Sequence, residues 1–283
     1  MKIGKATVAE SAICTSDDET IVVRGKDLCR ELIGQVGFVE YFHLLVTGTA
    51  PTPAATRVLN ATLVAIAEHG LVPSVQASRM TLAASPEAMQ GAVAAGILGC
   101  GSVILGASED AGRFFLRIDA LARERGLALA DAATVVVREL REAKRAIPGY
   151  GHPLHKERDP RVARLFAVAA EAAVAAGAGS GAAAPGRFVQ IAEAVEPVLP
   201  ALTGRELRLN VSAAIPAVLL DVGWPAEALK GVPLLARTAG LIAHLTEELA
   251  QPIGFALSYQ ATREQVYTGE VPAGWSPKSG SGH

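Results

Sequence analysis

The sequence predicts an all-α fold, because helical hydrophobic periods run through most of the chain and strand signals are few. The predicted helical share lies far above the usual third of residues. Half of the 283 residues are apolar but only 5% are aromatic, so alanine, leucine and valine must fill the core. One stretch, ETIVVRG at residues 19–25, favours a short hairpin edge.

The first half of the chain holds a 21-residue segment without a charged side chain, Ala88 to Ser108. Ser85-Pro86-Glu87 precedes it, and an N-cap residue, a proline and an acid in this order are typical of a helix start. The segment is long enough to span a bilayer. Five glycines and acidic flanks on both sides favour a buried, closely packed helix instead.

Later helices are delimited by similar signals. One helix is predicted to end at Gly126, and the next ends before Pro148. Asp159-Pro160 repeats the cap-and-proline signal and begins a helix that reaches a low-complexity stretch at 176–186. We interpret that stretch as a surface connection. A last long helix covers roughly 232–249.

Composition excludes several classes of function. The net charge of −2 and the pI near 6.3 give no basic surface for nucleic acid or an anionic membrane. Three cysteines share no metal-ligand spacing, so no metal site is predicted and a reduced compartment fits better than a disulfide framework. The N-terminus lacks the apolar core of a signal peptide. We expect a soluble, cytoplasmic protein.

Polar residues at the breaks between helices are the candidates for function. They are His69, His152, Arg161, the pair Asn210 and Ser212, and Arg237. Two histidines and two arginines without metal-ligand spacing suggest acid–base work on a carboxylate substrate. Structural roles stay open at this point: a histidine can cap a helix end, and Arg161 can simply pair with Asp159.

Five motifs in order resemble the citrate synthase family, which includes citryl-CoA lyases and the C-terminal part of ATP-citrate lyase. GYGHPLHKERDPR (149–161) is similar to the family's G-x-G-H…DPR segment, and VVRGKDLCRELIGQVGFVEYFHLLVTGTAPT (22–52) is similar to its N-terminal stretch. AEHGL (67–71), LNVSAAIPAVLLD (209–221) and ARTAGLIAH (236–244) are similar to its A-D-H, N-V-D and R-x-x-G-x-x-A-H motifs. The short chain is typical of the lyase-like members.

The resemblance implies a citrate synthase-like, all-helical homodimer. Residues 1–106 and 223–283 would form a large, dimer-forming domain, and residues 107–222 a smaller one. The cleft between the domains would close on substrate, and the glycine-rich uncharged helix would lie in the dimer interface.

The resemblance also implies roles for single residues. His69 would hydrogen-bond the oxaloacetate half of the substrate, and His152 would handle the proton of its hydroxyl group. Arg161 and Arg237 would grip carboxylates, with Asn210 and Ser212 in the N-V-D site. Contacts to coenzyme A are expected from Gly151, His155 and Lys156. Coenzyme A enters as a thioester substrate or product, and no permanently bound cofactor is implied.

Three departures from the family pattern narrow the function. Ile104 stands where synthases have the histidine that stabilises the acetyl-CoA enolate, which favours the lyase branch. Ser212 replaces the aspartate that acts as base on the acetyl methyl, and loss of a positioned base typically costs about 10² to 10⁴ in rate. Leu257 replaces an arginine lent by the partner subunit, unless an insertion brings Arg263 into place. Glu247 and Glu248 are interpreted as a solvated helix face.

The sequence therefore predicts a citryl-CoA lyase-like enzyme. It would cleave a 3-hydroxyacyl-CoA, citryl-CoA by default, to acetyl-CoA and a 2-oxoacid, oxaloacetate by default. Two alternatives stay open: a condensing enzyme of the citrate or 2-methylcitrate synthase type with another base, and a non-catalytic protein that binds acyl-CoA or an oxoacid.

Overall fold

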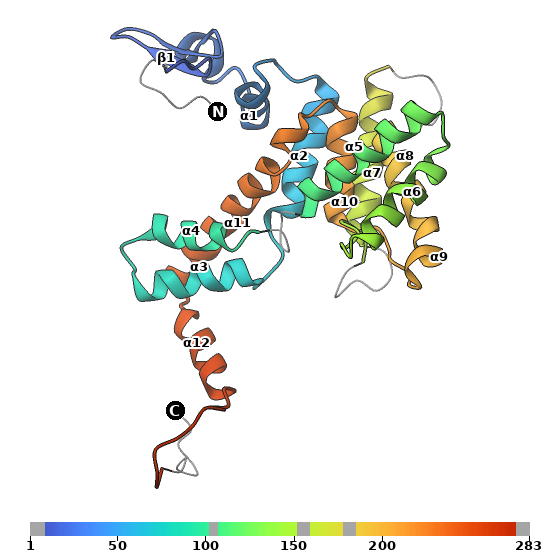
Figure 1. The fold of residues 1–283 in the computed structure, drawn as a ribbon. Helices are drawn as coiled ribbons and strands as arrows, with labels where there is room; N and C mark the ends of the chain where they lie inside the picture. Colours follow the sequence, from blue (N-terminus) through green and yellow to red (C-terminus); the bar gives the residue numbers. More distant parts are fainter. Residues whose placement is uncertain (1–8, 102–106, 152–158, 178–184, 276–283) are drawn as a thin grey trace. The chain divides into compact units, whose positions relative to one another are not determined.

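The computed structural model describes residues 9–101, 107–151, 159–177 and 185–275, and the described chain is almost wholly helical (Figure 1). The predicted all-α class is therefore confirmed. The predicted hairpin is also present: β1 (Cys14–Ser16), β2 (Ile21–Val23) and β3 (Lys26–Asp27) form a small antiparallel sheet in the order β1-β2-β3. None of the described helices is long and apolar enough to cross a bilayer.

The chain forms two compact units. The first comprises residues 1–65 and 107–232, and the second comprises 66–106 and 233–283. The division predicted from the sequence, with a small domain at 107–222, stays a prediction.

The first unit is built around one buried helix. Its helices are α1 (Phe38–Thr47), most of α2 (Pro53–Ala67), α5 (Ala107–Arg125), α6 (Leu129–Glu142), α7 (Pro160–Ala175), α8 (Arg187–Val195), α9 (Leu199–Thr203) and α10 (Val211–Asp221). Eight of the eleven residues of α10 are buried, as expected for a helix that is apolar on all sides. It packs against α5, α7 and α8 (Figure 1).

A glycine sets how closely α5 approaches its neighbours in this unit. A Cβ atom added at Gly112 would lie 2.3 Å from Leu229 Cδ1 and 3.3 Å from Pro216 Cβ. Only a residue without a side chain fits there, since protein interiors leave no free volume of that size.

The second unit contains α3 (Pro73–Ala84), α4 (Met89–Leu98), α12 (Gly254–Arg263) and the greater part of α11 (Gly231–Ala250). Leu82, Ala92 and Leu245 form its buried core. Gly96 lets α4 approach α11, because an added Cβ would lie 2.6 Å from Leu241 Cδ1.

One predicted helix start is wrong. Ser85 does not cap the uncharged helix: its hydroxyl donates to Glu87 Oε1 at 2.7 Å within a turn, and α4 begins at Met89. The preceding helix α3 begins at Pro73, and Ser74 lies buried in its first turn. Other boundaries agree with the prediction: α5 ends before Gly126, which has φ +62°, and α7 begins at Pro160.

Candidate functional site

The predicted site residues fall into both units. Gly151, Arg161, Asn210 and Ser212 belong to the first unit, and His69 and Arg237 to the second. His152, His155 and Lys156 lie outside the described residues, as does Ile104.

In the first unit, the loop that precedes His152 is attached to the start of α10. The Gly151 amide donates to the Arg208 carbonyl at 2.7 Å, and the Asn210 amide donates to the Gly149 carbonyl at 3.0 Å. Gly149 has φ +84°, and an added Cβ would lie 2.5 Å from Ala213 Cβ. The backbone of this loop therefore lies directly against α10.

Tyr150 fixes the same loop from its other side. Its side chain is buried, and its hydroxyl donates to the Ala192 carbonyl of α8 at 2.8 Å. Burial raises the pKa of Tyr150 well above its usual value, and Glu196 adds to the effect. Tyr150 therefore stays a neutral structural donor.

Asn210 is the N-cap of α10 and uses both ends of its amide. Oδ1 accepts from the Ser212 amide at 2.9 Å, which is the ordinary capping bond. Nδ2 donates to the Gly151 carbonyl at 2.6 Å. In this conformation Asn210 holds the helix start and the loop together, and Ser212 follows in the first turn.

Asp159 joins the first turns of two helices. It caps α7 through the Arg161 amide at 3.1 Å, and Oδ2 also accepts from the Val211 amide of α10 at 3.2 Å. Arg161 completes the arrangement, with Nε 3.0 Å from Oδ1 and Nη2 2.8 Å from Oδ2. Burial would raise the pKa of Asp159, but the bonds from Arg161 outweigh it and lower the pKa.

This ion pair orients Arg161 without using all of its donors. A guanidinium has five N–H groups in a planar fork. Asp159 takes one from Nε and one from Nη2, which leaves the Nη1 edge for another partner. Sequence reasoning left open whether Arg161 pairs with Asp159 or lies solvated, and the structure shows the pair.

A cationic hollow of about 340 Å³ lies beside Tyr150. Among the described residues, its three arginines have no carboxylate within ion-pair distance, so the hollow is electropositive. It is lined by Arg141, Arg145, Ala146, Ile147, Tyr150, Thr203, Arg205 and Leu207.

In the second unit, Arg237 is buried without a full set of partners. Its residue is only 3% exposed, and neither Nε nor Nη1 finds a hydrogen-bond partner within the described part of the chain. Cys100 and Ser74 lie nearby: burial raises the pKa of the Cys100 thiol, while Arg237 and the Ser74 hydroxyl act in the opposite direction. A buried guanidinium with unmet donors is able to bind an anion.

His69 lies in the exposed turn between α2 and α3. Glu68, next to it, closes this turn: its carboxylate accepts from the Gly70 amide at 2.5 Å and from His244 Nε2 at 3.0 Å. Burial would raise the pKa of Glu68, but the bonds from His244 and from the amides of Gly70 and His69 lower it.

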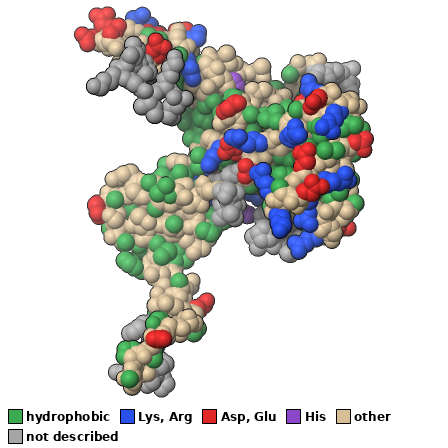
Figure 2. Space-filling view, viewed as in Figure 1, with side chains coloured by type: hydrophobic (Ala, Val, Ile, Leu, Met, Phe, Trp, Pro, Cys, Tyr) green, Lys and Arg blue, Asp and Glu red, His purple; other side chains and the backbone are tan. Residues whose placement is uncertain are grey.

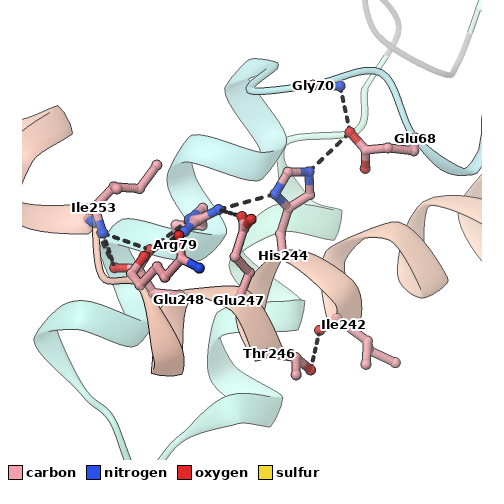
Figure 3. A network of polar contacts seen from close by, with 11 residues as sticks. Glu68, Gly70, Arg79, Ile242, His244, Thr246, Glu247, Glu248 and Ile253 are labelled. Atoms are coloured by element: carbon pink, nitrogen blue, oxygen red, sulfur yellow. Dashed lines mark hydrogen bonds and ion pairs between the residues drawn. The ribbon is translucent and has the colours of Figure 1, made fainter.

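His244 connects this turn to a buried ion-pair network (Figure 3). Arg79 Nη1 lies 3.3 Å from His244 Nδ1 and 2.5 Å from Glu247 Oε2, and Arg79 Nε lies 2.6 Å from Glu248 Oε2. Glu248 also accepts from the amides of Ile253 and Gly254, which caps the start of α12. Burial would raise its pKa, but these amides and Arg79 lower it.

The interpretation of Glu247 and Glu248 as a solvated face is therefore wrong for Glu248, which is 4% exposed. Its partner Arg79 comes from a helix 169 positions earlier in the chain. Sequence reasoning did not foresee the bond from the Val211 amide to Asp159 and gave no role to His244. A signal for His244 existed: it lies seven residues after Arg237 and therefore on the same face of α11.

The family model of the citrate synthase C-terminal domain matches residues 48–254. No curated protein sequence matches the chain significantly. Among solved structures, citryl-CoA lyase from Hydrogenobacter thermophilus is similar over 94% of this chain and 96% of its own, with 31% identity and a TM-score of 0.77.

Two further structures are similar over part of their own length. ATP citrate lyase from Methanothrix soehngenii, solved with citrate and coenzyme A, has 25% identity and a TM-score of 0.68 over 88% of this chain and 40% of its own. Citrate synthase from Thermotoga maritima has 20% identity and a TM-score of 0.58 over 86% of this chain and 60% of its own. At that identity the likeness to the synthase concerns the fold.

Proposed function

The chain belongs to the citrate synthase family, and from that premise we propose that it cleaves citryl-CoA to acetyl-CoA and oxaloacetate. The likeness to a citryl-CoA lyase over nearly the whole of both chains supports this direction of the chemistry. So does the likeness to an ATP citrate lyase that was solved with citrate and coenzyme A.

The reaction is a retro-Claisen cleavage. The hydroxyl group of citryl-CoA loses its proton to His152 and becomes the keto group of oxaloacetate. The carbon–carbon bond breaks, its electron pair passes to the thioester as an enolate, and protonation of that enolate gives acetyl-CoA. His69, Arg161 and Arg237 hold the oxoacid half, since fixed guanidinium forks both bind carboxylates and orient the bond that breaks.

Arg237 carries the proposal. A buried guanidinium with unmet donors is destabilising, and an anion that accepts from those donors would offset the cost. The orphaned Nε and Nη1 point to different sides of the fork, so each can donate to a separate oxygen of an anionic ligand. Citryl-CoA brings carboxylates on the half that becomes oxaloacetate.

The cationic hollow beside Tyr150 supports a coenzyme A substrate. Coenzyme A carries a 3′-phosphate and a diphosphate, and arginines bind phosphate oxygens in bidentate fashion. Arg141, Arg145 and Arg205 surround the hollow at the base of the loop that leads through Gly151 to His152. We assign to it the phosphates of the thioester substrate, together with the expected contacts from His155 and Lys156.

Ser212 is the residue that makes the direction of the reaction testable. A serine hydroxyl cannot deprotonate acetyl-CoA as a carboxylate does, which counts against an efficient synthase. Cleavage can proceed without that base, because water can protonate the enolate once the bond has broken. The same serine leaves the non-catalytic binding protein as the second candidate.

The deciding experiment measures oxaloacetate release from citryl-CoA, coupled to malate dehydrogenase. Wild type is compared with His152→Ala and Ser212→Asp. Turnover by wild type and its loss in His152→Ala support the lyase. An inert wild type that still binds citryl-CoA identifies the binding protein, and citrate formation from acetyl-CoA and oxaloacetate identifies the synthase.

We also propose that the chain forms a homodimer through the second unit. Figure 2 shows few charged side chains over α3 and α4. Leu98 of α4 is 86% exposed and Phe255 of α12 is 70% exposed, an unusual amount of open apolar surface for a monomer. Light scattering after size exclusion gives twice the chain mass if the proposal holds, and the Leu98→Glu variant shifts the protein toward monomer.

A further inference from the structure

Two residues of α11, Gly240 and His244, contact the segment that carries His69, and Arg237 lies on the same helix face. Arg237, Gly240 and His244 are spaced by three and four positions, so they lie along one face of the helix. At Gly240 the helix lies so close to the end of α2 that an added Cβ would be 2.1 Å from the Ala67 carbonyl oxygen. One turn further along, His244 Nε2 lies 3.0 Å from Glu68 Oε1.

The hydrogen-bond partners of His244 define which of its ring nitrogens donates. Arginine is always a donor, so Nδ1 accepts from Arg79 Nη1 at 3.3 Å. The ring proton is then on Nε2 and points to the Glu68 carboxylate (Figure 3). A neutral imidazole thus satisfies both neighbours, and Arg79 fixes which nitrogen serves Glu68.

Arg79 itself cannot move easily. It is 2% exposed and is held by Glu248 at 2.6 Å, by Glu247 at 2.5 Å and by the Gln251 carbonyl at 3.1 Å. The charged groups that face His244 are therefore Glu68 at the end of α2, Arg79 on α3 and, through Arg79, Glu247 and Glu248 on its own helix. Arg79, at one end of this series of contacts, is buried and firmly held. Glu68, at the other end, holds the exposed turn of His69.

We propose that His244 is a positioning residue: by fixing the Glu68 carboxylate, it holds the turn of His69 at a set distance from Arg237. Glu68 closes the turn through the amides of Gly70 and His69. Because Glu68 is half exposed, with 47% of its side chain accessible, these amides alone do not immobilise it. His244 supplies the tertiary bond that does.

The inference rests on the proposed function for its activity readout only. Misplacement of a substrate-positioning group by about 1 Å can cost on the order of 10²-fold in rate. We expect His244→Ala to lower kcat/KM for citryl-CoA about tenfold or more. The His244→Gln variant keeps an N–H donor near the Nε2 position and recovers most of that loss.

Thr246→Ala is the matched control, because Thr246 lies on the same helix and, among the residues that the structure describes, its hydroxyl bonds only to the Ile242 carbonyl at 2.9 Å. It should keep wild-type kinetics. The second variant is Glu68→Ala, alone and combined with His244→Ala. If both residues act through one bond, the double variant loses no more than either single variant.

A second readout does not depend on activity. Exchange of the Gly70 amide, followed by NMR, should accelerate severalfold in His244→Ala, return toward the wild-type rate in His244→Gln and stay unchanged in Thr246→Ala. An inert wild type would remove the proposed function but leave this result intact. Unchanged Gly70 exchange in His244→Ala, or additive losses in the double variant, would overturn the inference.

Discussion

Asn210 Nδ2 donates to the Gly151 carbonyl at 2.6 Å, and this bond joins the start of α10 to the loop that precedes His152. The same side chain caps α10 through the Ser212 amide. The side-chain amide of Asn210 thus bonds to two predicted site residues, Gly151 and Ser212. The consequence is that a change at Asn210 acts on both helix stability and catalysis.

The Asn210→Ala variant should unfold more easily, by about 1–2 kcal/mol, since it loses a cap and a tertiary hydrogen bond. Its turnover of citryl-CoA should fall as well, because the loop before His152 loses one of its bonds to α10. Urea denaturation and the coupled assay measure the two effects. The control is Asn60→Ala, at an exposed position of α2, which should change the free energy of unfolding by less than about 0.5 kcal/mol. Equal stability of the two variants would contradict the prediction.

Gly149 offers a second test of how the loop lies against α10. Gly149→Ala places a Cβ 2.5 Å from Ala213 Cβ at a φ of +84°, so overlap adds to backbone strain. We expect a loss of at least ~2 kcal/mol in the free energy of unfolding. Gly126→Ala has φ +62° but meets nothing within 4 Å, so it should lose only about 1 kcal/mol. If both variants lost the same amount, the close approach of loop and helix would be refuted.

The pH dependence of stability should report on Asp159. Burial acts to raise its pKa, but Arg161 and the Val211 amide hold it below the unfolded value. A lowered native pKa stabilises the fold above the unfolded value, ~4 for aspartate, and this contribution disappears as the pH falls through the native pKa. Asp159→Asn should therefore be less stable than wild type by roughly 2–4 kcal/mol at pH 7.

The difference in the free energy of unfolding between wild type and Asp159→Asn should narrow below about pH 4. Urea denaturation at pH 3, 4, 5 and 7 measures it. Asp18→Asn, at an exposed position near the N-terminal sheet, serves as control and should follow wild type. A gap that stays constant down to pH 3 would show that the charge of Asp159 is not what stabilises the junction.

Local sequence signals predicted a helix end correctly where a residue beside that end determines it through its nearest amides. Asp159-Pro160 begins α7 as expected, because a capping carboxylate and an N1 proline act through the nearest amides. Ser85-Pro86-Glu87 carries the same signal but forms a turn, in which the Ser85 hydroxyl bonds Glu87. Sequence cannot separate these two outcomes, since the choice depends on where the neighbouring helices pack.

Long-range pairs were beyond sequence reasoning. The Arg79–Glu248 pair spans 169 positions, and the periodicity of α11 places Glu248 on the face of Leu241 and Leu245 but does not name its partner. The family likeness named Arg237 and Asn210 as site residues. It could not show that Arg237 is left with unmet donors or that Asn210 already serves two backbone partners, because both facts depend on tertiary geometry.

The assignment of the cationic hollow to coenzyme A predicts a selective change in kinetics. Arg145→Ala and Arg205→Ala should each raise KM for citryl-CoA by about threefold to tenfold, since each removes a phosphate contact. Their kcat should change little, because the hollow does not contain the bond that breaks. Raised salt should weaken binding to wild type more than to the double variant. Arg125→Ala, exposed at the end of α5, should keep the KM of wild type. An unchanged KM in both Arg145→Ala and Arg205→Ala would mean that the phosphates of coenzyme A bind elsewhere.

Replacement of Arg237 should leave stability unchanged or raise it, and should abolish ligand binding. Methionine has a similar length and no unmet donors, and replacing a buried, poorly paired charge by an apolar side chain is often neutral or stabilising by about 1–4 kcal/mol. Arg237→Met should therefore melt at or above the temperature of wild type and have no measurable turnover. Oxaloacetate at millimolar concentration should raise the melting temperature of wild type, because a ligand that binds only the folded state stabilises it, and it should leave Arg237→Met unchanged. Arg113→Met, at an exposed position of α5, should respond to oxaloacetate as wild type does. A strongly destabilised Arg237→Met that still responds to oxaloacetate would mean that this arginine is a structural residue and that the oxoacid binds elsewhere.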